Sequence, residues 1–399
     1  MLQKLKRWFG YFYKVPWCVP AWGWPEMKVT VQCIFRNKII NGPYPSLFEN
    51  TVKQYIGLSY AIAVNRGRTA IELALCGFEL EELDEVILPS YVCKEVLEAV
   101  VRVGAKPIFA DIASDLHMTV ESIRAAITPK TKCVIVAHLF GKAAPIDEIE
   151  KFLEGMNIYL IDDAAQSFGA KLRGRLLGTF GDCGIVSCGP GKALAGSGGG
   201  LLVTNNSNLY KRASQKKLLH ENKTQVLRRV ILFWLWRRFR CYTLPFKIII
   251  ERVLGSIEIY PAKELYKMSN IEAAIGLEQF YSLKKNVKQR KENGQQVIRA
   301  LGGLAKYSVS DLSHDSMFLK LILTIPDQVF SVGNFINVLA TAGIECQSGY
   351  TPCHHTYNNK IVVPNTDSVW KNVVCVPVDT KVNKSILFSI ERAVLANKL

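Results

Sequence analysis

The stretch of sequence most informative about the fold is Ser187-Cys188-Gly189-Pro190-Gly191-Lys192, which follows a short apolar run and precedes a glycine-rich segment at 196–200. Earlier in the chain, the pair Asp162-Asp163 ends another apolar run, 158–161. Short, unbroken apolar runs are typical of strands buried on both faces, and sheets of such strands bind ligands at the carboxyl ends of the strands. The sequence therefore predicts a lysine and a carboxylate at one edge of an α/β sheet.

A lysine and a carboxylate placed in this way meet the requirements of pyridoxal phosphate (PLP). The lysine holds the cofactor as a Schiff base, and the carboxylate keeps the pyridine nitrogen protonated so that the ring accepts electrons. The segment Gly67-Arg68-Thr69-Ala70 opens a predicted helix, whose free backbone N–H groups suit a phosphate. We therefore predict PLP chemistry, with Lys192 as the residue that binds the cofactor.

Each motif also has a simpler interpretation. Lys192 alone is compatible with a solvated loop lysine, Asp162-Asp163 with a helix N-cap, and the glycines with a flexible loop. The lysine segment is not a Walker motif, because Ala193 stands where that motif has Ser or Thr. The order of the motifs, each after a predicted strand, favours the cofactor site.

The chain has 399 residues, too many for one ordinary core. We divide it into a basic, aromatic N-terminal segment (1–41), a large α/β domain (42–285) and a small α+β C-terminal domain (286–399). The large domain contains a basic, aromatic insertion at about 206–262. Its predicted fold is a mainly parallel sheet sandwiched by helices.

Hydrophobic patterns predict the individual elements. In the large domain, strands are expected at 85–88, 107–110, 133–137, 158–161, 184–187 and 201–204, and helices at 69–76, 94–103, 120–126, 146–155 and 270–286. In the small domain, strands are expected at 318–324 and 373–376, and helices at 330–341 and 384–396.

Cysteine and histidine usage bears on compartment and metals. The eleven cysteines are scattered singly without a CxxC, which favours reduced thiols in a cytoplasm. The six histidines show no HExxH or comparable spacing, so we predict no metal site. Pro16, Pro20 and Pro25 interrupt the N-terminal apolar stretches, which argues against a cleavable signal peptide.

The net charge of +16 is concentrated in two stretches. Residues 1–40 carry +6 and residues 211–240 carry +9, and together they hold six of the seven tryptophans. No nucleic-acid recognition motif accompanies this charge, so we predict no nucleic-acid partner. Tryptophan beside arginine is instead typical of interfacial segments. We predict a cytoplasmic protein attached peripherally to an anionic membrane surface through 1–24 and 228–252; the alternative is that these aromatic residues pack on protein.

The sequence also resembles the DegT/StrS family of PLP-dependent sugar aminotransferases, which have the fold type I of aspartate aminotransferase. The resemblance covers roughly residues 42–399 without most of 206–262. Its motifs occur in the family's order: Gly42-Pro43 with Phe48-Glu49, Asp84-Glu85-Val86-Ile87-Leu88-Pro89-Ser90-Tyr91, Gly104-Ala105-Lys106-Pro107 with Asp111, the segment 126–132, His138 with Gly141, Asp162-Asp163-Ala164-Ala165-Gln166-Ser167, Phe180-Gly181-Asp182, and Ala273-Ala274-Ile275-Gly276-Leu277-Glu278-Gln279.

The resemblance implies roles for individual residues. Lys192 is the Schiff-base lysine and the base for the proton shift, and Asp163 pairs with the pyridinium nitrogen. Gln166 lies near the 3-oxygen of PLP. Ser187 and the turn with Gly67, Arg68 and Thr69 hold the phosphate. The family also implies a homodimer, because its sites are built from two subunits.

At five positions the chain departs from the family's usual residues. Arg68 replaces a Ser or Thr, although a guanidinium also binds phosphate. Cys93 stands where an aromatic residue usually covers the cofactor ring; either Tyr91 takes over this role or the ring is unstacked. Ala193 replaces Asn, and Leu265 and Lys267 align with a phosphate-binding Asn and its neighbouring Arg. These changes leave PLP binding expected and the usual substrate in doubt.

The sequence thus predicts an aminotransferase that moves an amino group from an amino acid, glutamate by expectation, to a nucleotide-linked keto sugar. Two alternatives remain. One is another PLP-dependent reaction on the same fold, such as that of a dehydratase lacking the lysine, against which Lys192 argues. The other is a catalytically silent scaffold docked at a membrane.

Overall fold

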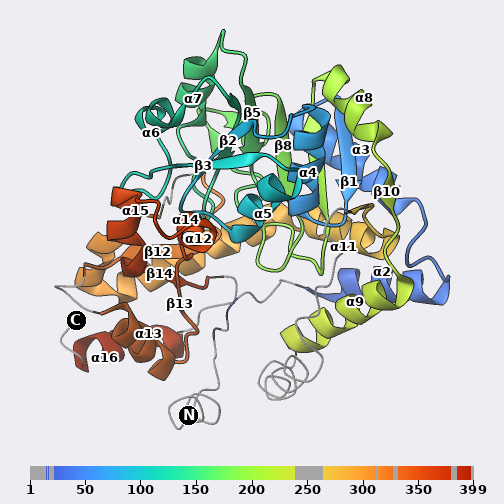
Figure 1. The fold of residues 1–399 in the computed structure, drawn as a ribbon. Coiled ribbons are helices and arrows are strands. Elements are labelled where there is room, and N and C mark those ends of the chain that lie inside the picture. The colour runs from blue at the N-terminus through green and yellow to red at the C-terminus, as the bar shows by residue number, and fades with distance from the viewer. Residues whose placement is uncertain are drawn as a thin grey trace.

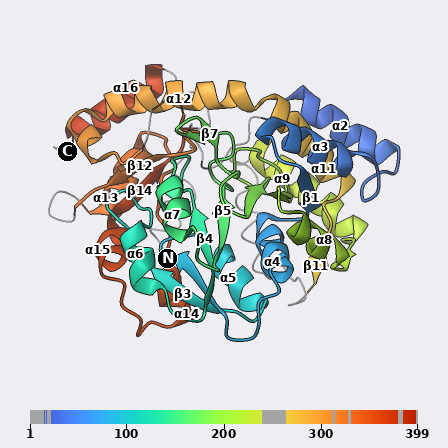
Figure 2. The ribbon, with the colours of Figure 1, turned by 90° about the horizontal axis from the view of Figure 1, so that it is seen from above.

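The computed structural model describes residues 15, 17, 22–238, 264–310, 313, 315–326, 331–378 and 384–396. Figure 1 shows a large α/β unit and a smaller C-terminal unit beside it. A single long helix, α12 (Leu283–Ala300), runs along both units when the molecule is viewed from above (Figure 2).

The large unit is built on a seven-stranded sheet with the order β1-β9-β8-β5-β4-β2-β3. All neighbours from β8 to β3 are parallel, whereas β9 is antiparallel to both β1 and β8. The strands are β1 (Tyr60–Val64), β2 (Glu85–Pro89), β3 (Lys106–Ala110), β4 (Thr131–Ala137), β5 (Tyr159–Asp163), β8 (Cys183–Ser187) and β9 (Gly200–Thr204). The prediction of a mainly parallel sheet sandwiched by helices is confirmed.

Helices cover both faces of the sheet because the strand side chains alternate between two apolar clusters. In β4, Cys133 and Ile135 belong to one cluster, and Val134 and Val136 to the other. The first cluster packs against α4 (Gly67–Gly77), α5 (Lys94–Arg102) and α8 (Ser207–Gln215). The second packs against α3 (Tyr44–Ile56), α6 (Val120–Ala126), α7 (Ile146–Leu153) and α11 (Asn270–Tyr281).

The six predicted strands and the first four predicted helices of this unit are confirmed, with shifts of a few residues at their ends. Strand β1 was not predicted. The single helix expected over 270–286 is wrong, because α11 ends at Tyr281 and α12 begins at Leu283 after a turn at Ser282. A small hairpin, β6 (Lys171–Leu172) with β7 (Arg175–Leu176), follows β5.

The C-terminal unit is an antiparallel three-stranded sheet with helices. Its strands are β12 (Leu321–Thr324), β13 (Gln347–Ser348) and β14 (Val373–Val376), in the order β12-β14-β13. Its helices are η1 (Gly302–Tyr307), α13 (Val332–Thr341), α14 (Cys353–Tyr357), α15 (Pro364–Val369), η2 (Trp370–Asn372) and α16 (Lys384–Ala396). Helix α12 joins the units, since Leu283 packs in the second cluster of the large sheet and Val297 in the core of the C-terminal unit.

Two basic, aromatic segments meet at one end of the large unit. Helix α2 (Trp24–Phe35) and helix α9 (Lys223–Arg238) lie side by side (Figure 1) and bury Val29, Val226 and Val230 against α11. The segment before α9 pairs with the chain after 263 through β10 (Leu218–Leu219) and β11 (Leu265–Tyr266).

The residues predicted to touch a membrane divide into three groups. In the first group, the rings of Trp22 and Phe233 pack edge to face at 5.0 Å. Arg229 also belongs to it and donates hydrogen bonds to Glu221 and Glu272. These residues contact protein, as the alternative proposed. Trp24 and Ile231 are exposed. Most of 1–21 and all of 239–252 lie outside the described residues. None of the described helices is long and apolar enough to cross a membrane.

Candidate active site

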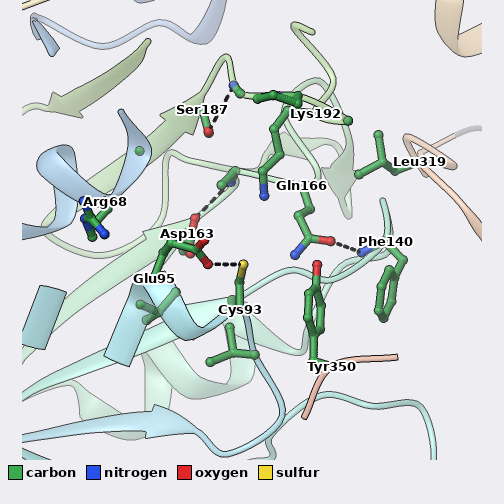
Figure 3. Close-up of a pocket in the computed structure, with 18 of the residues that line it drawn as sticks. Arg68, Cys93, Glu95, Phe140, Asp163, Gln166, Ser187, Lys192, Leu319 and Tyr350 are labelled. Carbon is green, nitrogen blue, oxygen red and sulfur yellow. Dashed lines mark hydrogen bonds between the residues drawn. The ribbon is translucent and has the colours of Figure 1, made fainter. Parts of the chain in front are cut away.

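A cavity of about 410 Å³ lies where the parallel strands end. Ala137, Asp163 and Ser187, the last residues of β4, β5 and β8, contribute to its wall. The C-terminal unit closes it from the other side with residues that include Lys320 and Tyr350. The cavity is therefore shared between the two units, and most of the predicted residues gather in it (Figure 3).

Lys192 reaches the cavity from the loop between β8 and β9. The loop is closed by a hydrogen bond from Cys188 N–H to Gly199 O (2.9 Å), and Gly191 has φ +75°, a conformation that favours glycine. Figure 3 shows the Lys192 side chain pointing into the space between Asp163 and Gln166. The glycines of this segment thus form the tight turn that delivers the amine.

Asp163 faces the cavity at the end of β5, as expected. It is 5% exposed, and its Oδ1 accepts a hydrogen bond from Ala165 N–H (3.0 Å). Burial raises the pKa of the Asp163 carboxyl above its usual value, while the Ala165 N–H and the nearby Lys192 oppose that rise. A buried carboxylate of this kind is stabilised by a cation placed against it.

One end of the cavity has the donors of an anion site. Gly67 begins α4, and a Cβ atom placed there would lie 3.0 Å from Cβ of Ser187. A side chain at position 67 would therefore require Ser187 to move by a few tenths of an ångström, which glycine avoids. The backbone N–H groups of the first turn of α4, together with the Ser187 hydroxyl, suit a phosphate.

Arg68 and Thr69 were predicted to join this anion site, and the structure places them differently from Gly67. Arg68 lines the cavity, but its Nη1 donates to Glu98 at 2.5 Å and its Nε lies 3.6 Å from Glu72. Thr69 is buried, its hydroxyl donates to Asn65, and it is not among the described residues that line the cavity. For Thr69, only the backbone N–H remains suited to the phosphate.

Tyr91, proposed to cover the cofactor ring, is fully buried and is not among the described residues that line the cavity. Its hydroxyl accepts a hydrogen bond from Tyr350 N–H at 3.2 Å. Tyr350 lines the cavity instead, and its hydroxyl points toward Gln166 (Figure 3). Sequence reasoning missed Tyr350, which lies in a different unit and far along the chain. The position of Tyr91 does not support direct contact with a cofactor.

Gln166 is held with its amide nitrogen available. Its Oε1 accepts a hydrogen bond from Phe140 N–H at 3.2 Å, which leaves the NH₂ group as the donor for a ligand. Cys93 also lines the cavity, and its thiol donates to Glu95. Burial raises the pKa of Cys93 to about 12. Burial also acts to raise the pKa of Glu95, but the thiol hydrogen bond and nearby Lys192 leave it below its usual value.

These groups fit PLP. The cavity combines a primary amine, a buried carboxylate and, at the α4 end, an anion site with a glycine where any side chain would crowd Ser187. The Gln166 amide adds a neutral donor. A phosphorylated, cationic ring with a carbonyl group is complementary to each of them.

Solved structures with the same fold include aminotransferases. The Helicobacter pylori aminotransferase PseC, involved in the biosynthesis of pseudoaminic acid, superposes with a TM-score of 0.77 over 97% of this chain and 98% of its own, at 17% identity. The fold is therefore that of PLP-dependent transferases of fold type I.

The chain belongs to the DegT/DnrJ/EryC1/StrS aminotransferase family, whose model matches residues 25–391. Among its relatives are two GDP-perosamine synthases. That of Vibrio cholerae is 26% identical over 346 residues, covering 85% of this chain and 86% of the relative. That of Escherichia coli O157:H7 is 33% identical over 200 residues, covering 50% of this chain and 55% of the relative. The protein is thus a PLP-dependent aminotransferase.

Proposed function

We propose that the protein transfers the amino group of glutamate to a nucleotide-linked keto sugar, giving 2-oxoglutarate and the amino sugar. The observation that carries this proposal is the entry of the Lys192 amine into the same cavity as the Asp163 carboxylate. The names of the related GDP-perosamine synthases support a sugar nucleotide as acceptor.

Lys192 and Asp163 carry the chemistry in this proposal. PLP, when bound, supplies an electron sink for the bonds at the amino-bearing carbon. The Lys192 amine would hold the cofactor and would move a proton at that carbon. Asp163 pairs with the protonated ring nitrogen, and this ion pair compensates the burial of its carboxylate.

The remaining residues position the cofactor. The Ser187 hydroxyl and the N–H groups of Gly67, Arg68 and Thr69 hold the phosphate, and the Gln166 amide donates to the 3-oxygen. The Arg68 guanidinium reaches the phosphate only if it turns away from Glu98. The Tyr350 hydroxyl points toward Gln166 (Figure 3), and we propose that Tyr350, in place of Tyr91, supplies the aromatic side chain beside the cofactor.

We further propose a homodimer. In this dimer, the partner subunit does not donate a hydrogen bond to the cofactor phosphate from position 265. Leu265 pairs with Leu218 and packs against the core of the large unit, so it offers no donor to a neighbouring phosphate. An apolar residue at this position removes one contact that a partner subunit normally supplies. The phosphate site then depends mainly on α4 and Ser187.

Peripheral attachment to an anionic membrane remains our proposal for the basic, aromatic segments. Helix α2 presents Trp24, Val31 and Phe35 along one exposed stripe, with Trp24 74% and Phe35 87% exposed. Residues 211–240, which contain the neighbouring α9, carry a net charge of +9. Apolar side chains beside cations are complementary to an anionic lipid surface, and the enzyme would then work near membrane-bound glycosyl transfer.

The reaction is tested in two halves. Glutamate alone should convert bound cofactor and release one equivalent of 2-oxoglutarate per site. A panel of nucleotide-linked keto sugars, beginning with GDP-linked ones, should then yield an aminated sugar nucleotide by mass spectrometry. Release of 2-oxoglutarate without amination of any acceptor would refute a nucleotide-linked keto sugar as the acceptor. No release of 2-oxoglutarate at all would refute glutamate as the donor.

A further inference from the structure

Three side chains of the C-terminal unit converge behind the cavity. His354 and His355 lie on α14, and Asp367 lies on α15. Both Nε2 atoms lie close to Oδ1 of Asp367, at 3.1 Å for His354 and 2.7 Å for His355, and the potential ligand atoms are all within 4.8 Å of one another. We propose that this triad binds a divalent transition-metal ion of the Zn²⁺ class.

The donor set and its spacing suit such an ion. Two imidazoles and one carboxylate, with an open fourth position for water, form a common zinc site. With ligands about 2.0–2.1 Å from a tetrahedral ion, neighbouring donor atoms are about 3.3 Å apart. The observed separations of 3.1 Å for His354 and 2.7 Å for His355 are about 0.2 and 0.6 Å below that value. An ion therefore needs only small movements of the side chains.

The outer atoms of two ligands are already fixed. Nδ1 of His354 is hydrogen-bonded to the Ser90 hydroxyl, and Oδ2 of Asp367 accepts a hydrogen bond from Val363 N–H at 3.1 Å. These contacts leave Nε2 of His354 and Oδ1 of Asp367 facing each other. Metal sites commonly orient their ligands through second contacts of this kind.

The site is also reachable. His354 is fully buried, whereas the side chains of His355 and Asp367 are each 31% exposed. The ion can therefore enter from the exposed side and retain a water molecule there. Without metal, the same geometry is a pair of hydrogen bonds between the two imidazoles and one carboxylate oxygen.

The expected role of the ion is to fix a wall of the cavity. Cys353 N–H donates to Ser90 O at 2.7 Å, and Tyr350 N–H donates to the Tyr91 hydroxyl. The segment that carries the triad is thus attached to the segment after β2, which leads to Cys93. A bound ion would stiffen this attachment and hold Tyr350 in place. The ion itself would take no part in the aminotransfer chemistry of Lys192.

The test uses untagged, full-length, PLP-loaded protein. After chelation and re-addition of Zn²⁺, followed by extensive dialysis, elemental analysis should find about one ion per chain. His355→Ala and Asp367→Asn should each lose at least four-fifths of it, and the exposed His220 provides a matched control in His220→Ala, which should keep it. His355→Gln serves as a milder variant if His355→Ala fails to fold.

A second readout does not depend on retention during dialysis. Co²⁺ should give visible d–d absorption with the wild type and with His220→Ala, but not with His355→Gln. The proposal is overturned if the wild-type protein holds no stoichiometric metal, or if the triad variants bind metal as well as the wild type does. The triad would then be a hydrogen-bonded cluster without a metal ion. Neither result depends on the sugar or the amino donor, so failure here is separate from failure of the proposed function.

Discussion

Asp162 and Asp163 are neighbours in the chain but project from opposite faces of β5. Asp163 faces the cavity. Asp162 is fully buried on the other side, where Oδ1 lies 2.8 Å from Nε2 of His138 and Oδ2 accepts hydrogen bonds from the N–H groups of Gly178 and Phe180. Because side chains alternate along a strand, only one of the two carboxylates can serve the cofactor.

Substitution of the two aspartates should therefore have different consequences. Asp163→Asn should lower turnover by orders of magnitude with little loss of stability, since the ring nitrogen loses its ionic partner. Asp162→Asn should chiefly lower the melting temperature, because a buried acceptor of three hydrogen bonds is altered. Turnover and thermal unfolding of both variants separate the effects. Equal losses of turnover, or a larger loss for Asp162→Asn, would reverse the assignment.

Arg68 provides a second test, because its guanidinium has a choice of partners. If it turns to the cofactor, Arg68→Ala should weaken PLP binding roughly tenfold or more, as expected for a hydrogen bond to a charged group. Glu98→Gln, which removes the competing carboxylate, should leave PLP binding unchanged or tighter. Equilibrium dialysis of PLP measures both. Unchanged PLP affinity in Arg68→Ala would leave Arg68 as a partner of Glu98 and Glu72 only.

The Cys93 thiol should remain protonated throughout the neutral range. With a pKa of about 12, its thiolate fraction near pH 8 is about one part in ten thousand and rises tenfold per pH unit. Iodoacetamide labelling of Cys93 in cofactor-free protein, followed by peptide mass spectrometry from pH 7 to 9.5, should increase throughout without a plateau. A plateau near pH 9 would show an ordinary thiol.

Membrane attachment is tested by flotation with liposomes. The protein should float with anionic vesicles at low salt, and less with neutral vesicles, because cations and exposed aromatic residues both contribute. Trp24→Ser with Phe35→Ser should reduce flotation without affecting turnover, since both side chains are exposed and neither lines the cavity. If the double variant alters only oligomeric state by light scattering, the α2 stripe contacts a second copy instead.

The sequence predicted best what depends on local pattern. Continuous apolar runs identified the parallel strands and predicted the Asp162-Asp163 pair and Lys192 at one edge of the sheet. The resemblance to the DegT/StrS family singled out Asp163 and added Ser187, and these two residues line the cavity with Lys192. Strand β1 (Tyr60–Val64) was missed although all five of its residues are apolar; it lies at the edge of the sheet, and two of its residues are alanines, which favour strands less than β-branched residues do. The break at Ser282 escaped because apolar spacing continues across it from α11 into α12.

What could not be predicted depends on how distant segments meet. Tyr350 reaches the cavity only because the C-terminal unit docks against the segment after β2. There, the Tyr91 hydroxyl accepts a hydrogen bond from the Tyr350 backbone N–H. The pairing of Arg68 with Glu98 depends on α4 packing beside α5. The triad of His354, His355 and Asp367 comes from two helices, so no short sequence motif predicts it.

The central claim is that Lys192 binds PLP, and one measurement tests it most directly. The protein loaded with PLP is reduced with borohydride and digested, and the modified peptide is identified by mass spectrometry. A second lysine, Lys320, also lines the cavity, so the result is not determined by access alone. We predict a phosphopyridoxyl group on Lys192, and no labelling together with no multiple turnover in Lys192→Ala. A label on Lys320, or near wild-type turnover of Lys192→Ala, would contradict the account.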